Sequence, residues 1–144
     1  MRTRLSMIIA SAIALLFAIT LQSAAHHAFG SEFDPNRPVL LKGKIVKIEW
    51  VNPHAWIHVE VTNPDGSKDV WMVEGGSPNS LLRRGVTKES LQPGIEIVVD
   101  GYQARDYTLK RANGRNVTYP DGRKLFLASS APNAEDKEPA DKKK

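Results

Sequence analysis

Apolar and polar side chains alternate over residues 46–50 and again over 55–61, within a stretch from 39 to 61 that is broken at Asn52-Pro53. A period of two predicts β-strands, so this stretch predicts one strand over 39–50 and a second over 55–61. Gly43 interrupts the first strand, and a lone glycine inside a strand indicates a bulge or a sharp bend. The side chains predicted to share the apolar faces of the two strands are Val46, Ile48, Trp50, Ala55, Ile57, Val59 and Val61.

The rest of the chain predicts more strands and one short helix. Ser77 can accept a hydrogen bond as an N-cap, Pro78 suits the first helical turn, and Gly85 suits the residue after the helix. The remaining predicted elements are, in order, a strand over 68–75, the helix between Ser77 and Gly85, a strand over 95–102, a turn-rich region over 105–115 and a final strand over 124–128.

This order of elements predicts a mainly β fold of a particular kind. Three strands in a meander, a short helix and two further strands are the order of the OB-fold, a five-stranded Greek-key barrel with its helix between strands three and four. The alternative is another small β-barrel or a β-sandwich. The predicted OB-like domain covers 39–128.

The first 25 residues have the three parts of a secretory signal peptide. Arg2 and Arg4 precede an apolar run over 5–21, and small residues follow it. The run is short for a membrane span, which needs about 20 apolar residues. We therefore predict cleavage after Ala25, with Ala24 as the second choice and an uncleaved anchor as the alternative, and we place the mature protein in the periplasm or outside the cell.

The two segments that flank the predicted barrel lack a regular pattern. Residues 26–38 predict an N-terminal arm without helix or strand, held to the barrel by Phe29 and Phe33. Residues 129–144 contain no large apolar side chain, which predicts a disordered tail.

Composition limits the chemistry. The chain has 144 residues and no cysteine, so disulfides are excluded and any bound metal would need nitrogen or oxygen ligands. Without Arg2 and Arg4, 18 Lys and Arg residues face 16 Asp and Glu residues. This small excess argues against nucleic-acid binding, which needs a concentrated basic face.

Several motifs resemble a known family. The segments AHHAF, EWVNPHAWI, GSPNSLLRRG and PDGRKLF are similar to a family of small exported bacterial proteins of unknown function. The barrel order is more distantly similar to periplasmic bacterial OB-fold proteins. The resemblance implies export and supports the domain boundaries, but it brings no activity or ligand.

Histidines are the strongest candidates for chemistry. After cleavage, His26 and His27 would lie at the new chain end, where an α-amine and an imidazole together favour Cu(II). His54 has the freedom of a turn to join them. His58 is a weaker candidate because residues four apart in a strand are about 13 Å apart, too far for both to bind one ion. The alternative is that these histidines serve only solubility and turn structure.

A second candidate surface is aromatic. Trp56, His58 and Trp71 lie on predicted strands of the sheet that OB-folds use for binding.

No nucleophile elbow, phosphate-binding glycine loop or zinc-protease motif occurs, so we predict no enzyme. The sequence predicts an exported binding or accessory module, with copper as the first ligand. The alternative is a metal-free module that binds an envelope protein through the tryptophan-bearing face.

Overall fold

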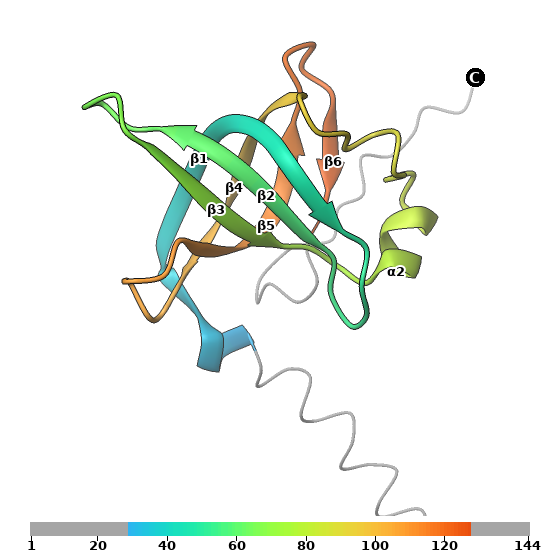
Figure 1. The fold of residues 1–144 in the computed structure, drawn as a ribbon. Coiled ribbons are helices and arrows are strands. Elements are labelled where there is room, and N and C mark those ends of the chain that lie inside the picture. The colour runs from blue at the N-terminus through green and yellow to red at the C-terminus, as the bar shows by residue number, and fades with distance from the viewer. Residues whose placement is uncertain (1–28, 128–144) are drawn as a thin grey trace, which may run out of the picture.

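The computed structural model describes residues 29–127, and these form one curved β-sheet with a short helix at its side (Figure 1). The strands lie in the order β3-β2-β1-β4-β5-β6, and neighbours in this order are antiparallel. β3 also pairs with β5, in parallel, through Met72, Val73 and Glu74. The elements are β1 (Phe33–Glu49), β2 (Trp56–Thr62), β3 (Lys68–Glu74), α2 (Pro78–Arg83), β4 (Glu96–Ala104), β5 (Arg111–Thr118) and β6 (Lys124–Phe126).

The predicted β-rich fold is confirmed, but the number of strands was wrong. The structure has six strands in its sheet where five were expected. The predicted last strand is the short β6, and the strand before it, β5, begins inside the region predicted to be turns. The sequence of β5 shows no alternation of apolar residues from which a strand could be predicted. β5 is a strand because it pairs with β3 and β4. Its Gly114 has no room for a Cβ, which would lie 2.7 Å from Val73 Cγ1.

The N-terminal arm also differs from its prediction. β1 begins at Phe33, six residues before the expected start, and residues 29–32 form a helical turn. The early part of β1 pairs with the end of β4, with a register shift between Phe33 and Pro38. That irregularity fits a segment with two prolines, which cannot donate to the ladder. Phe29 and Phe33 are buried against Tyr102, which confirms that these rings hold the segment to the sheet.

The core lies on the concave side of the sheet. The predicted inner face of β2 is confirmed by the burial of Ala55, Ile57 and Val59. Val46 was expected beside Ile48, but a bulge between Ile45 and Lys47 turns it outward, where it is 41% exposed. The buried side chains of the main core are Leu41, Ile45, Ala55, Ile57, Val59, Val73, Leu81, Val86, Leu91, Ile97, Val99, Ala112, Val117, Tyr119 and Leu127.

Gly43 marks a close approach of strands rather than the bulge itself. A Cβ at this position would lie 2.1 Å from the carbonyl oxygen of Glu60. Only glycine therefore permits β1 to pair with β2 on one side and β4 on the other at this point. The bulge that Gly43 was predicted to mark lies instead between Ile45 and Lys47.

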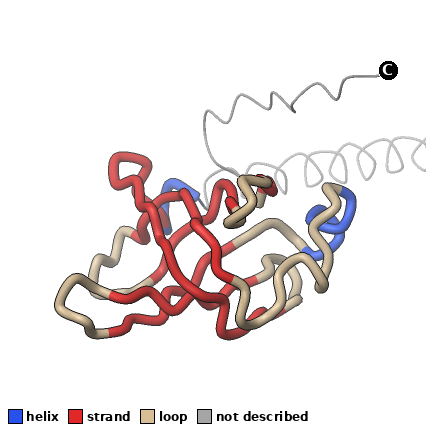
Figure 2. Tube along the Cα trace, turned by 90° about the horizontal axis from the view of Figure 1, so that it is seen from above, coloured by secondary structure: helices blue, strands red, loops and turns tan. Residues whose placement is uncertain are grey.

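The short helix follows its prediction. Ser77 Oγ accepts from Ser80 N at 3.3 Å, Pro78 is the first helical residue, and Gly85 has a φ of +79°. Figure 2 shows the helix lying beside the sheet rather than across it. Within residues 29–127, no helix has the length and apolar character needed to cross a membrane. The predicted signal peptide and the predicted tail lie outside the described residues.

Candidate functional site

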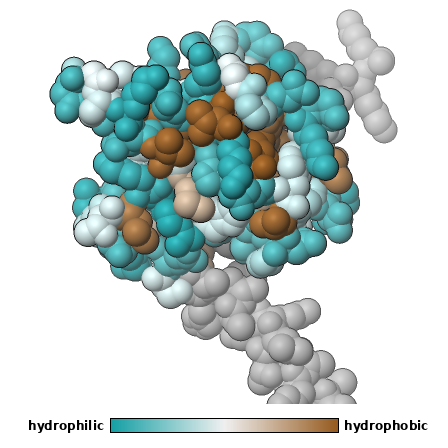
Figure 3. Space-filling view, viewed as in Figure 1, coloured by the Kyte–Doolittle hydropathy of each residue, from teal (hydrophilic) through white to brown (hydrophobic). Residues whose placement is uncertain are grey.

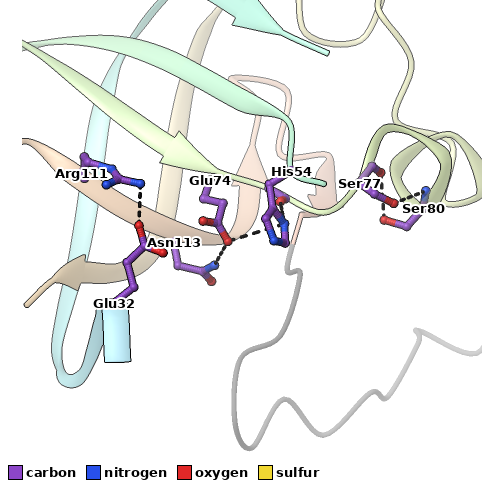
Figure 4. Close-up of polar contacts among 8 residues, drawn as sticks. Glu32, His54, Glu74, Ser77, Ser80, Arg111 and Asn113 are labelled. Atoms are coloured by element: carbon purple, nitrogen blue, oxygen red, sulfur yellow. Dashed lines mark hydrogen bonds and ion pairs between the residues drawn. The ribbon is translucent and has the colours of Figure 1, made fainter. Parts of the chain in front are cut away.

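His54 lies in the loop between β1 and β2, against the end of β3 (Figure 4). Two backbone hydrogen bonds fix this loop: Ala55 N donates to Gly76 O at 3.0 Å, and Gly75 N donates to Ala55 O at 2.9 Å. The ring atom Nδ1 of His54 is 3.3 Å from Gly75 O and 3.7 Å from Glu74 Oε1. The imidazole is therefore attached to the sheet through one of its two nitrogens.

Glu74 and Asn113 form a buried polar pair next to His54. They lie opposite each other in the parallel β3–β5 pairing, and they are 5% and 0% exposed. Asn113 Nδ2 donates to Glu74 Oε1 at 3.2 Å. A carboxylate in a protein interior needs such partners because it has lost its hydration. We refer to His54, Glu74 and Asn113 as the Glu74 cluster.

The contacts of His54 determine where its proton lies. Gly75 O and Glu74 Oε1 are both hydrogen-bond acceptors, so the nitrogen that faces them must carry the hydrogen. Nδ1 is then the donor, and in the neutral ring Nε2 keeps its lone pair. No described residue forms a hydrogen bond with Nε2. This is the arrangement in which a histidine can bind a metal ion.

His58 is engaged in a different way. Its Nε2 lies 2.8 Å from Glu49 Oε1, and Lys47 Nζ lies 2.8 Å from the same oxygen. The hydrogen bonds from Lys47 first, and then from His58, lower the pKa of the Glu49 carboxyl group. His58 is therefore a sheet-surface residue paired across strands, as its strand position predicted. Among residues 29–127, no three His, Asp or Glu side chains converge on a point that could hold a metal ion.

The two tryptophans of the predicted binding face lie on opposite sides of the sheet. Trp56 lies opposite Glu74 on the outer side, and the Arg111 guanidinium covers its ring at 4.7 Å. Trp71 lies opposite Val59 and packs against the core. The prediction placed both rings on one face because it did not follow the alternation along β3. The structure therefore provides no shared aromatic platform.

His26 and His27 lie outside the described residues, but the segment that follows them is fixed close to the Glu74 cluster. Glu32 Oε1 is 2.6 Å from Arg111 Nη2, and Arg105 Nε donates to Gly30 O at 2.6 Å. Arg111 and Asn113 are two residues apart on β5, which corresponds to about 7 Å along the strand. Figure 4 shows the Glu32–Arg111 pair and the Glu74 cluster side by side.

A separate cleft lies away from the Glu74 cluster. It has a volume of about 660 Å³ and is lined by residues that include Lys42, Lys44, Glu60 and Glu96. Lys44 lies opposite Glu60 in one pairing and opposite Glu96 in the other. Together with Lys68, the lining therefore carries charges of both signs.

Sequence reasoning missed two members of the cluster. Glu74 lies in the strand predicted over 68–75 but was not proposed as a site residue, and Asn113 fell in the region predicted to be turns. One signal was available: Glu74 directly follows the buried end of an apolar strand and precedes two glycines. A charge in that position indicates a buried or functional group.

Comparison with known proteins now adds the family. A family model described as a family of unknown function, DUF6152, matches residues 14–113. The chain belongs to this family. No curated protein and no solved structure matches the chain. Membership in DUF6152 confirms the predicted resemblance to a family of unknown function, whereas export and the motif pattern remain predictions.

Proposed function

We propose that this member of DUF6152 is an exported, OB-like β-barrel accessory module that binds one Cu(II) ion through His26, His27 and His54. The proposal combines a chain end created by signal-peptide cleavage with a histidine presented by the folded domain. It assigns no catalytic step to the protein.

The strand pairings support the OB-like barrel. β1 pairs with β2, β2 with β3, β3 with β5, β5 with β4, and β4 with β1. These five pairings form a cycle, and α2 lies between β3 and β4 in the chain, as in the OB-fold. β6 is then an addition at the outer edge of β5.

One observation carries the metal proposal: His54 is attached to the sheet through Nδ1, which leaves Nε2 for a ligand. Metal-binding histidines commonly donate their other ring N–H to a carboxylate or a backbone carbonyl, and His54 faces one of each. Its side chain is 36% exposed, so an ion from solvent can reach it.

The anchored N-terminal segment supports the participation of His26 and His27. Burial of Phe29 and the Glu32–Arg111 pair hold the segment near the Glu74 cluster, two residues after His27. Each extended residue spans at most about 3.5 Å, so the mature chain end is tethered within a short reach of this region. An α-amine and imidazoles form a nitrogen-rich set, which Cu(II) prefers.

Calorimetric titration of Cu(II) into the exported, processed protein tests the proposal, after mass spectrometry has confirmed a chain start at residue 25 or 26. We expect one saturable site per chain. His54→Ala and the double variant His26→Ala/His27→Ala should each weaken binding by about 10-fold or more, because each removes a ligand. His58→Ala is the matched control and should retain the wild-type affinity.

Two results would reject this function: no saturable one-to-one binding by the wild-type protein, or unchanged binding by the double variant.

The second candidate is a metal-free module that binds an envelope protein. It is favoured by exposed apolar side chains on the outer side of β1 and β3, Val46 and Val70, which are 41% and 47% exposed. Figure 3 shows apolar side chains scattered among polar ones on the face that it presents. Metal content of protein purified from the periplasm separates the two candidates.

A further inference from the structure

We propose that Glu74 and Asn113 are positioning residues that fix His54 for cation binding and make the site selective for a divalent cation. This inference rests on the proposed function, because it concerns the same ion. It adds two residues that were not predicted to be part of the site, and it assigns them distinct tasks.

Glu74 is unusual among the carboxylates of the described residues. Apart from Asp34, every other Asp and Glu of residues 29–127 is at least partly exposed, whereas Glu74 is 5% exposed at the end of β3. Burial of a carboxylate is unfavourable unless its partners compensate for the lost hydration. A carboxylate at this position therefore needs a reason beyond the packing of the core, and the adjacent His54 supplies one.

A single oxygen connects the three members of the cluster. Glu74 Oε1 accepts from Asn113 Nδ2 at 3.2 Å and lies 3.7 Å from His54 Nδ1. Asn113 is fully buried, and the β3–β5 register sets its position opposite Glu74. Asn113 thus holds Oε1 in place, Gly75 O accepts the hydrogen of Nδ1, and the carboxylate lies beside the same nitrogen. Figure 4 shows the three side chains in this order.

The charge of Glu74 has a second effect. A cation bound at Nε2 draws electron density from the ring, which makes the Nδ1–H group a stronger donor to Gly75 O, its hydrogen-bond acceptor at 3.3 Å. The negative charge, poorly screened because it is buried, also stabilises the added positive charge of the ion. An anion at the same place would be repelled. The chemical class that the cluster selects is therefore a divalent cation that accepts an imidazole ligand.

The test uses an isosteric change with a matched control. Glu74→Gln keeps an acceptor for Asn113 and removes the charge, and Glu49→Gln makes the same change beside His58. We expect Glu74→Gln to weaken Cu(II) binding by about 10-fold, because it removes a buried negative charge close to the ligating ring. We also expect its Cu(II) paramagnetic resonance spectrum to change. Glu49→Gln should match the wild type in affinity and in spectrum.

The spectrum separates positioning from a purely structural role, because a loss of stability alone would leave the spectrum of the bound ion unchanged. The inference is overturned if Glu74→Gln binds with wild-type affinity and spectrum while His54→Ala binds more weakly. If the wild-type protein binds no Cu(II), the proposed function itself fails. Should Glu74→Gln not fold, Asn113→Ala decides: it keeps the charge but removes the amide that donates to Oε1, and unchanged affinity and spectrum in this variant would equally overturn the inference.

Discussion

The two histidine–carboxylate pairs of the described residues differ in burial and in the nitrogen that makes the contact. His58 and Glu49 lie 2.8 Å apart on neighbouring strands, and the Glu49 side chain is 32% exposed. His54 and Glu74 lie 3.7 Å apart at a loop, and the Glu74 side chain is 7% exposed. The His58–Glu49 contact is the shorter of the two, but it is the weaker candidate for function. The length of a contact does not show which histidine nitrogen is still available for a ligand.

The difference lies in which nitrogen each histidine uses. His58 contacts its carboxylate through Nε2, the nitrogen far from the backbone, and its side chain is 14% exposed. His54 contacts its acceptors through Nδ1, and its Nε2 makes no hydrogen bond with a described residue. The first pair links two strands through Nε2, whereas the second leaves Nε2 without a hydrogen bond to any described residue. Three predictions sharpen this contrast.

The largest expected effect comes from removal of the two carboxylates. Glu74→Ala leaves a buried cavity and removes the acceptor of the buried Asn113 amide, so the free energy of unfolding should fall by about 2–4 kcal/mol. Glu49→Ala should lower the urea midpoint only slightly, because the Glu49 contacts are partly exposed to solvent. Urea denaturation of both variants measures the difference. Equal losses in the two variants would mean that burial does not distinguish the pairs.

A smaller effect is expected from pH. The Glu49 pKa is lowered in the folded protein, mainly by Lys47 and then by His58. A carboxyl group with a lower pKa in the folded than in the unfolded chain stabilises the fold at neutral pH and loses that contribution as the pH falls through its folded pKa. The wild type should therefore lose its advantage over Glu49→Gln as the pH falls from about 5 to about 3.

Urea midpoints of both proteins across this range measure that pH effect. Convergence of the two curves on acidification is expected. An advantage of the wild type that grows on acidification would show that the sign of the Glu49 shift is wrong.

Local rules predicted those parts of the fold that depend on neighbours in sequence. The inner face of β2 follows from alternation, and the helix start at Ser77 and its end at Gly85 follow from capping chemistry. β5 could not be predicted in the same way, because pairing with β3 and β4 produces it. The outward turn of Val46 depends on a bulge that the alternating pattern conceals.

The candidate site shows the same division. His54 could be proposed from its residue type and its position after Asn52-Pro53. Glu74 and Asn113 could not be joined to it, since they are 39 residues apart and only the parallel β3–β5 register brings them together. The nitrogen that His54 presents depends on Gly75 O and Glu74 Oε1, which are positions in space rather than features of the sequence.

The most direct test of this account is the tautomeric state of the two histidines, measured in the wild-type protein without metal. Long-range proton–nitrogen correlation spectra of the neutral imidazoles report which ring nitrogen carries the hydrogen. We predict opposite tautomers, with the hydrogen on Nδ1 in His54 and on Nε2 in His58. Hydrogen on Nε2 of His54 would contradict the account, because that nitrogen would then have no lone pair for a metal ion.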